Sequence, residues 1–148
     1  MAYDRNDLLF LGRMNIRYHE NRELHYERFI NWTAFASVLF SSAAFVSVSP
    51  LFPESWQSFR EIFTALIALA VTALNGVVLA LGMFNKFTTH ADLKRQWMGF
   101  LARLERTDDA HWEEIERAFH DLNAREPAAD QQLLNAMHQQ TKDALGWQ

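Results

Sequence analysis

The sequence predicts an all-α membrane protein in which two transmembrane helices form a hairpin, with helical extensions and C-terminal helices on the cytoplasmic side. Three observations lead to this prediction. No charged residue lies between Phe29 and Pro53 or between Ile62 and Asn85. The segment that joins these two tracts is short and contains Pro50 as well as Pro53. Basic residues are concentrated outside the two tracts rather than between them.

The composition indicates that the apolar residues are clustered along the chain. Of the 148 residues 49% are hydrophobic, with 12 Phe and 5 Trp, yet the mean hydropathy is slightly negative. The absence of cysteine excludes a disulfide framework, a thiolate metal site and a cysteine nucleophile. The net charge of -4 gives no reason to expect a nucleic acid as a partner.

The first element is a predicted cytoplasmic helix over residues 1–28. This stretch contains no proline and one glycine, Gly12, and its apolar residues Leu8, Leu11 and Tyr18 fall near a spacing of three to four. Arginines and acidic residues are interspersed along it, whereas a secretory signal has a short basic start followed at once by an apolar stretch. We therefore expect this helix to be retained and to run into the first span.

The next elements are a transmembrane helix over residues 29–49, a short extracytoplasmic loop over 50–61 and a second transmembrane helix over 62–85. A helix of about 24 residues reaches about 36 Å, enough for a hydrocarbon core of about 30 Å. Two buried helices of a soluble protein would need a large apolar shell, and the rest of the chain is too polar to supply one. Pro50 and Pro53 end the first helix, because proline lacks the backbone N–H and fixes φ.

The distribution of basic residues predicts that both termini lie in the cytoplasm and that the hairpin spans the cell inner (plasma) membrane. Arginines that include Arg13, Arg17, Arg22 and Arg28 precede the first span, and basic residues that include Lys86, Lys94, Arg95 and Arg103 follow the second, whereas the loop contains only Arg60. Trp32 lies at the cytoplasmic boundary of the first span, where aromatic belts occur, although an ordinary lipid or core contact explains a single tryptophan equally well.

The last element is a cytoplasmic helical region over residues 86–148. Trp97, Leu101 and Leu104 continue the periodicity of the second span. Residues 107–109 then supply candidate N-cap residues for a short amphipathic helix whose apolar face contains Ile115 and Phe119. Pro127 fits the start of a final helix, and Gly146 fits its end.

Small and polar residues recur at helical spacing inside the two uncharged tracts. They are Thr33, Ser37 and Ser41 in the first span and Thr64, Ala68, Thr72, Asn75 and Gly76 in the second. One interpretation is close helix–helix packing, which such residues permit. The other is that several hairpins assemble and the face of the second span lines a pore, with Glu54 and Glu61 as acidic rings at its mouth. Glu61 also fits as a helix N-terminal acid and Glu54 as a solvated loop charge.

No residue pattern indicates a metal site, a cofactor or a catalytic centre. The histidines do not have the i, i+4 spacing of helical metal ligands, so solvated or packed side chains are expected. The polar and aromatic segment that contains Arg17, His19 and Arg22 fits a ligand or partner surface. It fits equally well a helical stalk held together by aromatic and ion pairs.

Taken together, several segments resemble the SLATT domains, two-transmembrane modules associated with bacterial defence systems. The segments are the basic helix with Arg17 to Arg22, the two-span hairpin, the stretch Phe84 to Ala91 after it, and Glu126-Pro127 before the final helix. The resemblance implies a membrane effector that oligomerises and permeabilises the inner membrane when a signalling or sensor protein triggers it. It supplies no catalytic residue.

The expected surroundings of the hairpin are the lipid bilayer. Two functional hypotheses follow. In the first, the chain is an oligomeric, pore-forming or channel-like inner-membrane protein that assembles with its own copies. A two-span protomer is too small to enclose a pore alone, so conduction requires several copies. In the second, it is a membrane-anchored adaptor whose cytoplasmic helices recruit a partner protein. Its candidate contacts are Trp112, Phe119 and Trp147, although packing within the chain is the favoured interpretation of the first two.

Overall fold

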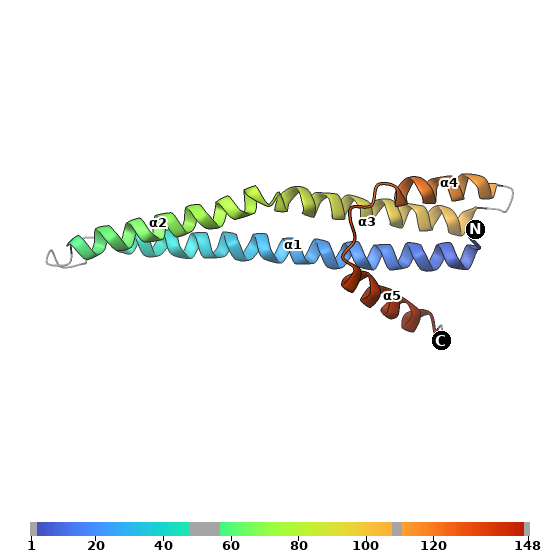
Figure 1. Cartoon of the computed structure of the whole chain (residues 1–148), viewed down its shortest axis with the longest axis horizontal. Coiled ribbons are helices and arrows are strands. Elements are labelled where there is room, and N and C mark those ends of the chain that lie inside the picture. Colours follow the sequence, from blue (N-terminus) through green and yellow to red (C-terminus); the bar gives the residue numbers. More distant parts are fainter. Residues whose placement is uncertain (1–2, 48–56, 108–110, 147–148) are drawn as a thin grey trace. The chain divides into compact units, whose positions relative to one another are not determined.

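The computed structural model describes residues 3–47, 57–107 and 111–146. Within these ranges the chain is all-α, as the sequence predicts, and no strand is present (Figure 1). The helices are α1 (Arg5–Ser47), α2 (Gln57–Ala80), α3 (Met83–Arg106), α4 (Trp112–Asn123) and α5 (Gln131–Leu145).

The chain divides into two compact units, and α1 and α3 contribute to both. The first, here called the multihelical unit, contains the start of α1 up to Leu24 and the chain from Thr88 onward. The second, here called the hairpin unit, contains His25–Phe87, which includes the rest of α1 and the whole of α2.

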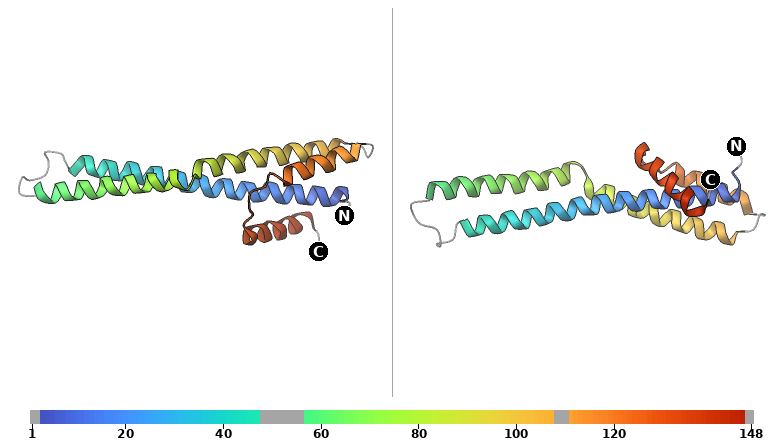
Figure 2. Two further views of the ribbon diagram at one scale, coloured as in Figure 1. Left: turned by 45° about the horizontal axis from the view of Figure 1, so that its top comes forward. Right: turned by 90° about the horizontal axis from the view of Figure 1, so that it is seen from below.

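In the hairpin unit, the second half of α1 and α2 lie side by side and run in opposite directions (Figures 1 and 2). The α2 side chains that are least exposed recur at a spacing of three to four, as expected for one face of a helix packed on another. They include Thr64, Ile67, Val71, Leu74 and Val78. From α1, the inward positions include Tyr26, Ile30, Thr33 and Ser37.

Most of the remaining apolar side chains of the hairpin unit are exposed. On α2 the exposed fraction is 63% for Ile62, 66% for Leu69 and 73% for Leu79. Among the described residues, Ser58–Ala80 is the one stretch that qualifies, by length and composition, as a helix able to cross a membrane. The predicted first span lies on α1, and its last residues, 48–49, fall outside the described residues, as does most of the predicted loop.

The second predicted span differs from the structure at both ends. Its helix begins at Gln57, inside the predicted loop, and ends at Ala80, whereas the sequence periodicity predicts a helix that runs through residue 85 and onward. A turn at Leu81 and Gly82 separates α2 from α3. Gly82 has a φ of 58°, the left-handed conformation in which glycine commonly ends a helix because it has no Cβ to clash.

The multihelical unit has its own hydrophobic core, built from α1, α3 and α4. On α3, Trp97, Phe100 and Leu104 are fully buried, and the Trp97 and Phe100 rings meet edge to face with centroids 5.6 Å apart. The rest of this core consists of Leu8 from α1 and Ile115, Phe119 and Leu122 from α4. The predicted apolar face that contains Ile115 and Phe119 is therefore the one that α4 buries.

Helix α5 packs on α1 through a second, smaller cluster, in which Met137 contacts apolar side chains of α1. Its N-cap is Asp130, whose side chain accepts hydrogen bonds from the backbone N–H groups of Gln132 and Leu133. The helix therefore begins after Asp130 rather than at Pro127, because an Asp cap satisfies N–H groups that Pro127 does not. Gly146 ends α5 with a φ of 68°, which confirms that prediction.

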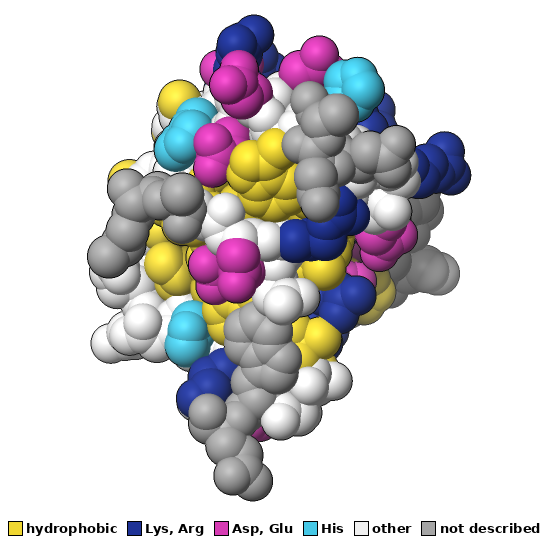
Figure 3. All heavy atoms as spheres, turned by 90° about the vertical axis from the view of Figure 1, so that its right-hand side faces the viewer, with side chains coloured by type: hydrophobic (Ala, Val, Ile, Leu, Met, Phe, Trp, Pro, Cys, Tyr) yellow, Lys and Arg dark blue, Asp and Glu magenta, His cyan; other side chains and the backbone are white. Residues whose placement is uncertain are grey.

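The start of α4 also differs from the prediction. The N-cap residue is His111, and its side chain makes no capping hydrogen bond. Of the predicted cap residues, Thr107 lies just after α3, and Asp108 and Asp109 lie outside the described residues. Figure 3 looks onto this end of the molecule, where acidic, basic and histidine side chains are interspersed around apolar ones.

Candidate functional sites

The small and polar residues of α2 differ in their exposure. Thr64 is half-buried on the face that packs against α1, whereas Ala68, Thr72, Asn75 and Gly76 are exposed. We call these four residues the polar stripe. Packing within one hairpin therefore explains the position of Thr64 but not that of the polar stripe.

Two side chains of the polar stripe bond to the backbone of their own helix. The Thr72 hydroxyl donates to the Ala68 carbonyl oxygen at 2.8 Å, and the Asn75 side-chain amide donates to the Val71 carbonyl oxygen at 3.0 Å. These bonds lower the cost of placing polar groups in an apolar helix. An asparagine amide has two N–H donors and one carbonyl oxygen. After one such bond, the Asn75 side chain still has a donor and an acceptor for hydrogen bonds to another chain.

The small residues of α1 lie mainly on the inward face. Thr33 is buried and donates from its hydroxyl to the Phe29 carbonyl oxygen at 2.9 Å, and Ser37 is half-buried, whereas Ser41 is exposed. Close helix packing thus describes Thr33 and Ser37. Of the predicted pore-mouth residues, Glu61 is exposed in the first turns of α2, and Glu54 lies outside the described residues.

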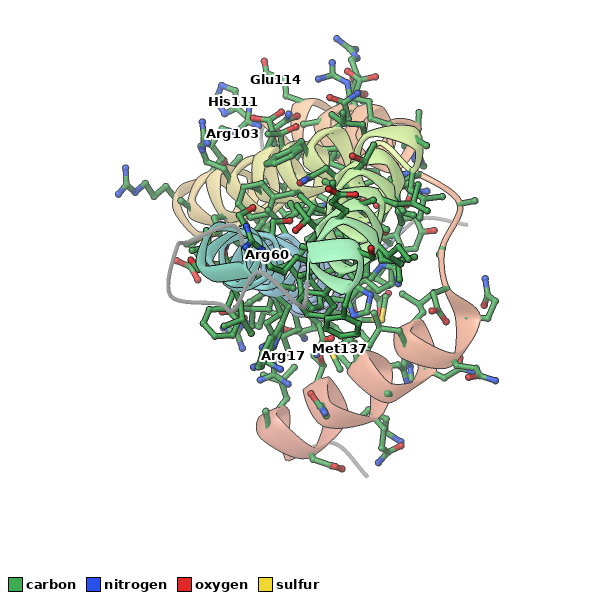
Figure 4. All side chains as sticks on the ribbon, turned by 90° about the vertical axis from the view of Figure 1, so that its left-hand side faces the viewer. Arg17, Arg60, Arg103, His111, Glu114 and Met137 are labelled. Carbon is green, nitrogen blue, oxygen red and sulfur yellow. The ribbon has the colours of Figure 1, made fainter. Side chains whose placement is uncertain are left out.

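The three residues of the predicted ligand surface take part in contacts inside the multihelical unit. Arg17 donates from Nη1 to the Gln140 carbonyl oxygen of α5 at 2.6 Å, near the position where Met137 meets α1 (Figure 4). The Arg22 guanidinium lies 3.6 Å from the Asp130 carboxylate. His19 is fully buried. The alternative interpretation, a packed helical stalk, therefore describes His19, which has no exposed surface to offer a partner.

His19 belongs to a buried polar network that the sequence does not predict. Its Nδ1 lies 2.8 Å from Nδ1 of His90 on α3, and its Nε2 lies 2.9 Å from Oε1 of Glu126 in the segment between α4 and α5. The same Glu126 oxygen accepts a hydrogen bond from the indole N–H of Trp97 at 2.6 Å. One carboxylate thus connects this segment to both α1 and α3.

The geometry limits the number of protons that the network holds. The bond between the two Nδ1 atoms requires one donor and one acceptor, so the two rings cannot both be fully protonated without breaking it. Burial, and then the electrostatic effects of the neighbouring His19 and Arg22, lower the pKa of His90 from 6.5 to about 4, with Glu126 acting in the opposite direction. His90 is therefore neutral near pH 7.

The missed histidine pair has a signal in the sequence, although a weak one. His90 extends the series of buried α3 residues Leu93, Trp97, Phe100 and Leu104 by one further turn. A histidine at such a position is expected inside the unit. Its partners are distant in the chain, so spacing alone does not identify them.

The described residues contain no group of three or more histidine, aspartate or glutamate side chains arranged to hold a metal ion. Comparison with protein-family models, with curated protein sequences and with solved structures found no match.

Proposed function

We propose that the chain is a two-span integral protein of a bacterial inner membrane, with both termini in the cytoplasm, that assembles with its own copies into a pore. Two features support membrane insertion: the candidate span Ser58–Ala80, and the exposed aromatic and aliphatic side chains of α1 beside it. On α1, Phe35 is 59% exposed and Val38 is 67% exposed, which suits contact with lipid.

The observation that supports the pore most directly is the exposure of the polar stripe. Ala68, Thr72, Asn75 and Gly76 lie in the uncharged part of α2 and are exposed rather than packed against α1. In a bilayer, the free energy of such residues is lower when they face other helices or water than when they face acyl chains. A ring of hairpins that turns this face inward gives a conduit lined by hydroxyl and amide groups.

The multihelical unit then serves as the cytoplasmic part that governs assembly or opening. The resemblance to SLATT domains extends this proposal to a defence effector that permeabilises the membrane when a signalling or sensor protein engages that part. The hydrophobic core shared by α1, α3 and α4 suits a rigid body to which such a partner binds.

Ion flux from liposomes tests the pore with a matched pair of substitutions. Thr72→Val and Thr64→Val remove the same hydroxyl from one helix, Thr72 at an exposed position and Thr64 at a half-buried position against α1. Thr72→Val and Asn75→Leu are expected to lower the flux at least several-fold, whereas Thr64→Val leaves it near the wild-type rate. Wild-type protein that passes no ions under any triggering condition, or equal effects of the two threonine variants, contradicts the pore.

A membrane-anchored adaptor is the second candidate. The observation that favours it is the separate hydrophobic core of the multihelical unit, which is suited to presenting a stable surface to a partner protein. Cross-linking in the membrane separates the two functions. A discrete ring of four or more copies supports the pore, and a monomer or dimer bound to another protein supports the adaptor.

A further inference from the structure

Arg28 differs from most arginines of α1 in having no partner within the described part of the chain. Arg5 donates to the carbonyl oxygens of Leu104 and Thr107, and Arg17 and Arg22 bond to the segment from Asp130 to Thr141. Arg28 is exposed, and no hydrogen bond or ion pair to another described residue is found for it. It is also the last charged residue before the first uncharged tract.

Arg28 lines a shallow hollow on α1 together with Asn31, Trp32 and Phe35. The hollow has a volume of about 300 Å³. Its four residues follow a spacing of three, four and seven from Arg28, so they lie on one face of the helix. The Trp32 and Phe35 rings meet edge to face with centroids 5.8 Å apart, and Trp32 is 69% exposed.

We propose that this hollow binds the headgroup phosphate of an anionic phospholipid, an inference that rests on the proposed membrane insertion. The Arg28 guanidinium matches a phosphate with two parallel N–H donors. The Asn31 amide supplies a further donor, and so does the indole N–H of Trp32. Phe35 lies one turn further along the apolar tract, where it meets the first carbons of the acyl chains.

The arrangement along α1 favours a lipid over a soluble phosphate compound. Polarity falls steadily from a cation at Arg28, through an amide and an indole, to a purely apolar ring at Phe35. A phospholipid has the same order from its phosphate to its acyl chains. A soluble anion would leave the exposed Trp32 and Phe35 surfaces without a matching group.

The test uses full-length protein in nanodiscs of equimolar phosphatidylcholine and phosphatidylglycerol, with bound lipids identified by native mass spectrometry. Wild-type protein is expected to retain phosphatidylglycerol in preference to phosphatidylcholine. Arg28→Gln is expected to reduce this preference about five-fold, which corresponds to the ~1 kcal/mol typical of a basic residue at a membrane surface. Lys86→Gln is the matched control, because Lys86 is exposed and is the first charge after the second uncharged tract.

The outcomes separate this inference from the proposed function. Equal retention by wild type and Arg28→Gln overturns the headgroup site, and so does an equal loss in Arg28→Gln and Lys86→Gln, which indicates diffuse attraction only. A protein that does not enter nanodiscs at all contradicts membrane insertion itself. A lost lipid preference in Arg28→Gln with unchanged ion flux supports the site and leaves the pore unaffected.

Discussion

Glu126 accepts hydrogen bonds from two donors that come from different helices, the His19 imidazole and the Trp97 indole. Glu126→Ala leaves both donors buried without an acceptor. We expect the free energy of unfolding to fall by about 2–6 kcal/mol, since each of the two unsatisfied buried groups costs about 1–3 kcal/mol. Thermal unfolding followed by near-ultraviolet circular dichroism of the tryptophans measures this loss.

Glu126→Gln is the control, because the amide keeps a carbonyl oxygen at the same position and loses only the charge. Its effect is expected to be smaller than that of Glu126→Ala. A Glu126→Ala variant as stable as wild type would show that the carboxylate does not hold the linking segment to α1 and α3.

The lowered pKa of His90 predicts how the free energy of unfolding depends on pH. Its pKa is lowered from 6.5 to about 4, so the unfolded chain binds a proton at a pH where the folded chain does not. The contribution of neutral His90 to stability is complete above pH 6.5 and is lost as the pH falls from 6.5 toward 4. Urea unfolding across this range, with an NMR titration of the His90 ring, measures both quantities. A titration midpoint near 6.5 contradicts the prediction.

At the scale of elements, the turn between α2 and α3 depends on one glycine. Gly82→Ala is expected to lower the free energy of unfolding by about 1 kcal/mol, because a φ of 58° brings a Cβ against the following carbonyl oxygen. Gly99→Ala is the matched control in the interior of α3, where an added Cβ meets nothing within 4 Å. There alanine favours the helix and raises stability by up to about 1 kcal/mol. The stabilities of the two variants are compared through their denaturant midpoints in the same detergent. A Gly82→Ala variant as stable as wild type would contradict the role of Gly82 in the turn.

Helices with long apolar periodicity could be predicted from the sequence, because burial of one face largely determines a helix. The face of α4 that contains Ile115 and Phe119 is an example, and the αL glycine at Gly146 is another. The break after Ala80 could not be predicted. The apolar pattern continues through Gly82, and a glycine inside such a pattern is compatible both with an uninterrupted helix and with a turn.

The candidate sites were harder to predict from the sequence than the helices. Periodicity selected the polar residues of α2 but did not separate Thr64, which faces α1, from Thr72 and Asn75, which do not. That separation depends on how α1 and α2 pack. The network of His19, His90 and Glu126 joins three segments far apart in the chain, so only the tertiary fold brings it together.

At the scale of the whole molecule, the chain joins a unit with a conventional buried core to a unit in which many large apolar side chains are exposed. In the multihelical unit Trp97, Phe100 and Leu104 are fully buried, whereas on α2 of the hairpin unit Leu79 is 73% exposed. In the proposed membrane insertion, lipid covers these side chains, and the length of the uncharged tracts fits a hydrocarbon core.

The number of membrane crossings determines on which side each terminus lies. Because the chain has no cysteine, single-cysteine variants report this cleanly. We expect Glu54→Cys to react with a membrane-impermeant maleimide added to intact cells. We expect Asn6→Cys and Asn135→Cys, at exposed positions of α1 and α5, to react only after the cells are opened.

A chain that crosses only once, through Ser58–Ala80, gives a different pattern. Asn6→Cys then reacts like Glu54→Cys, because both precede the single span, and Asn135→Cys alone lies on the opposite side. The proposal of a two-span hairpin is correct only if Asn6→Cys and Asn135→Cys behave alike and Glu54→Cys differs from both. Reaction of all three variants in intact cells would argue against either topology.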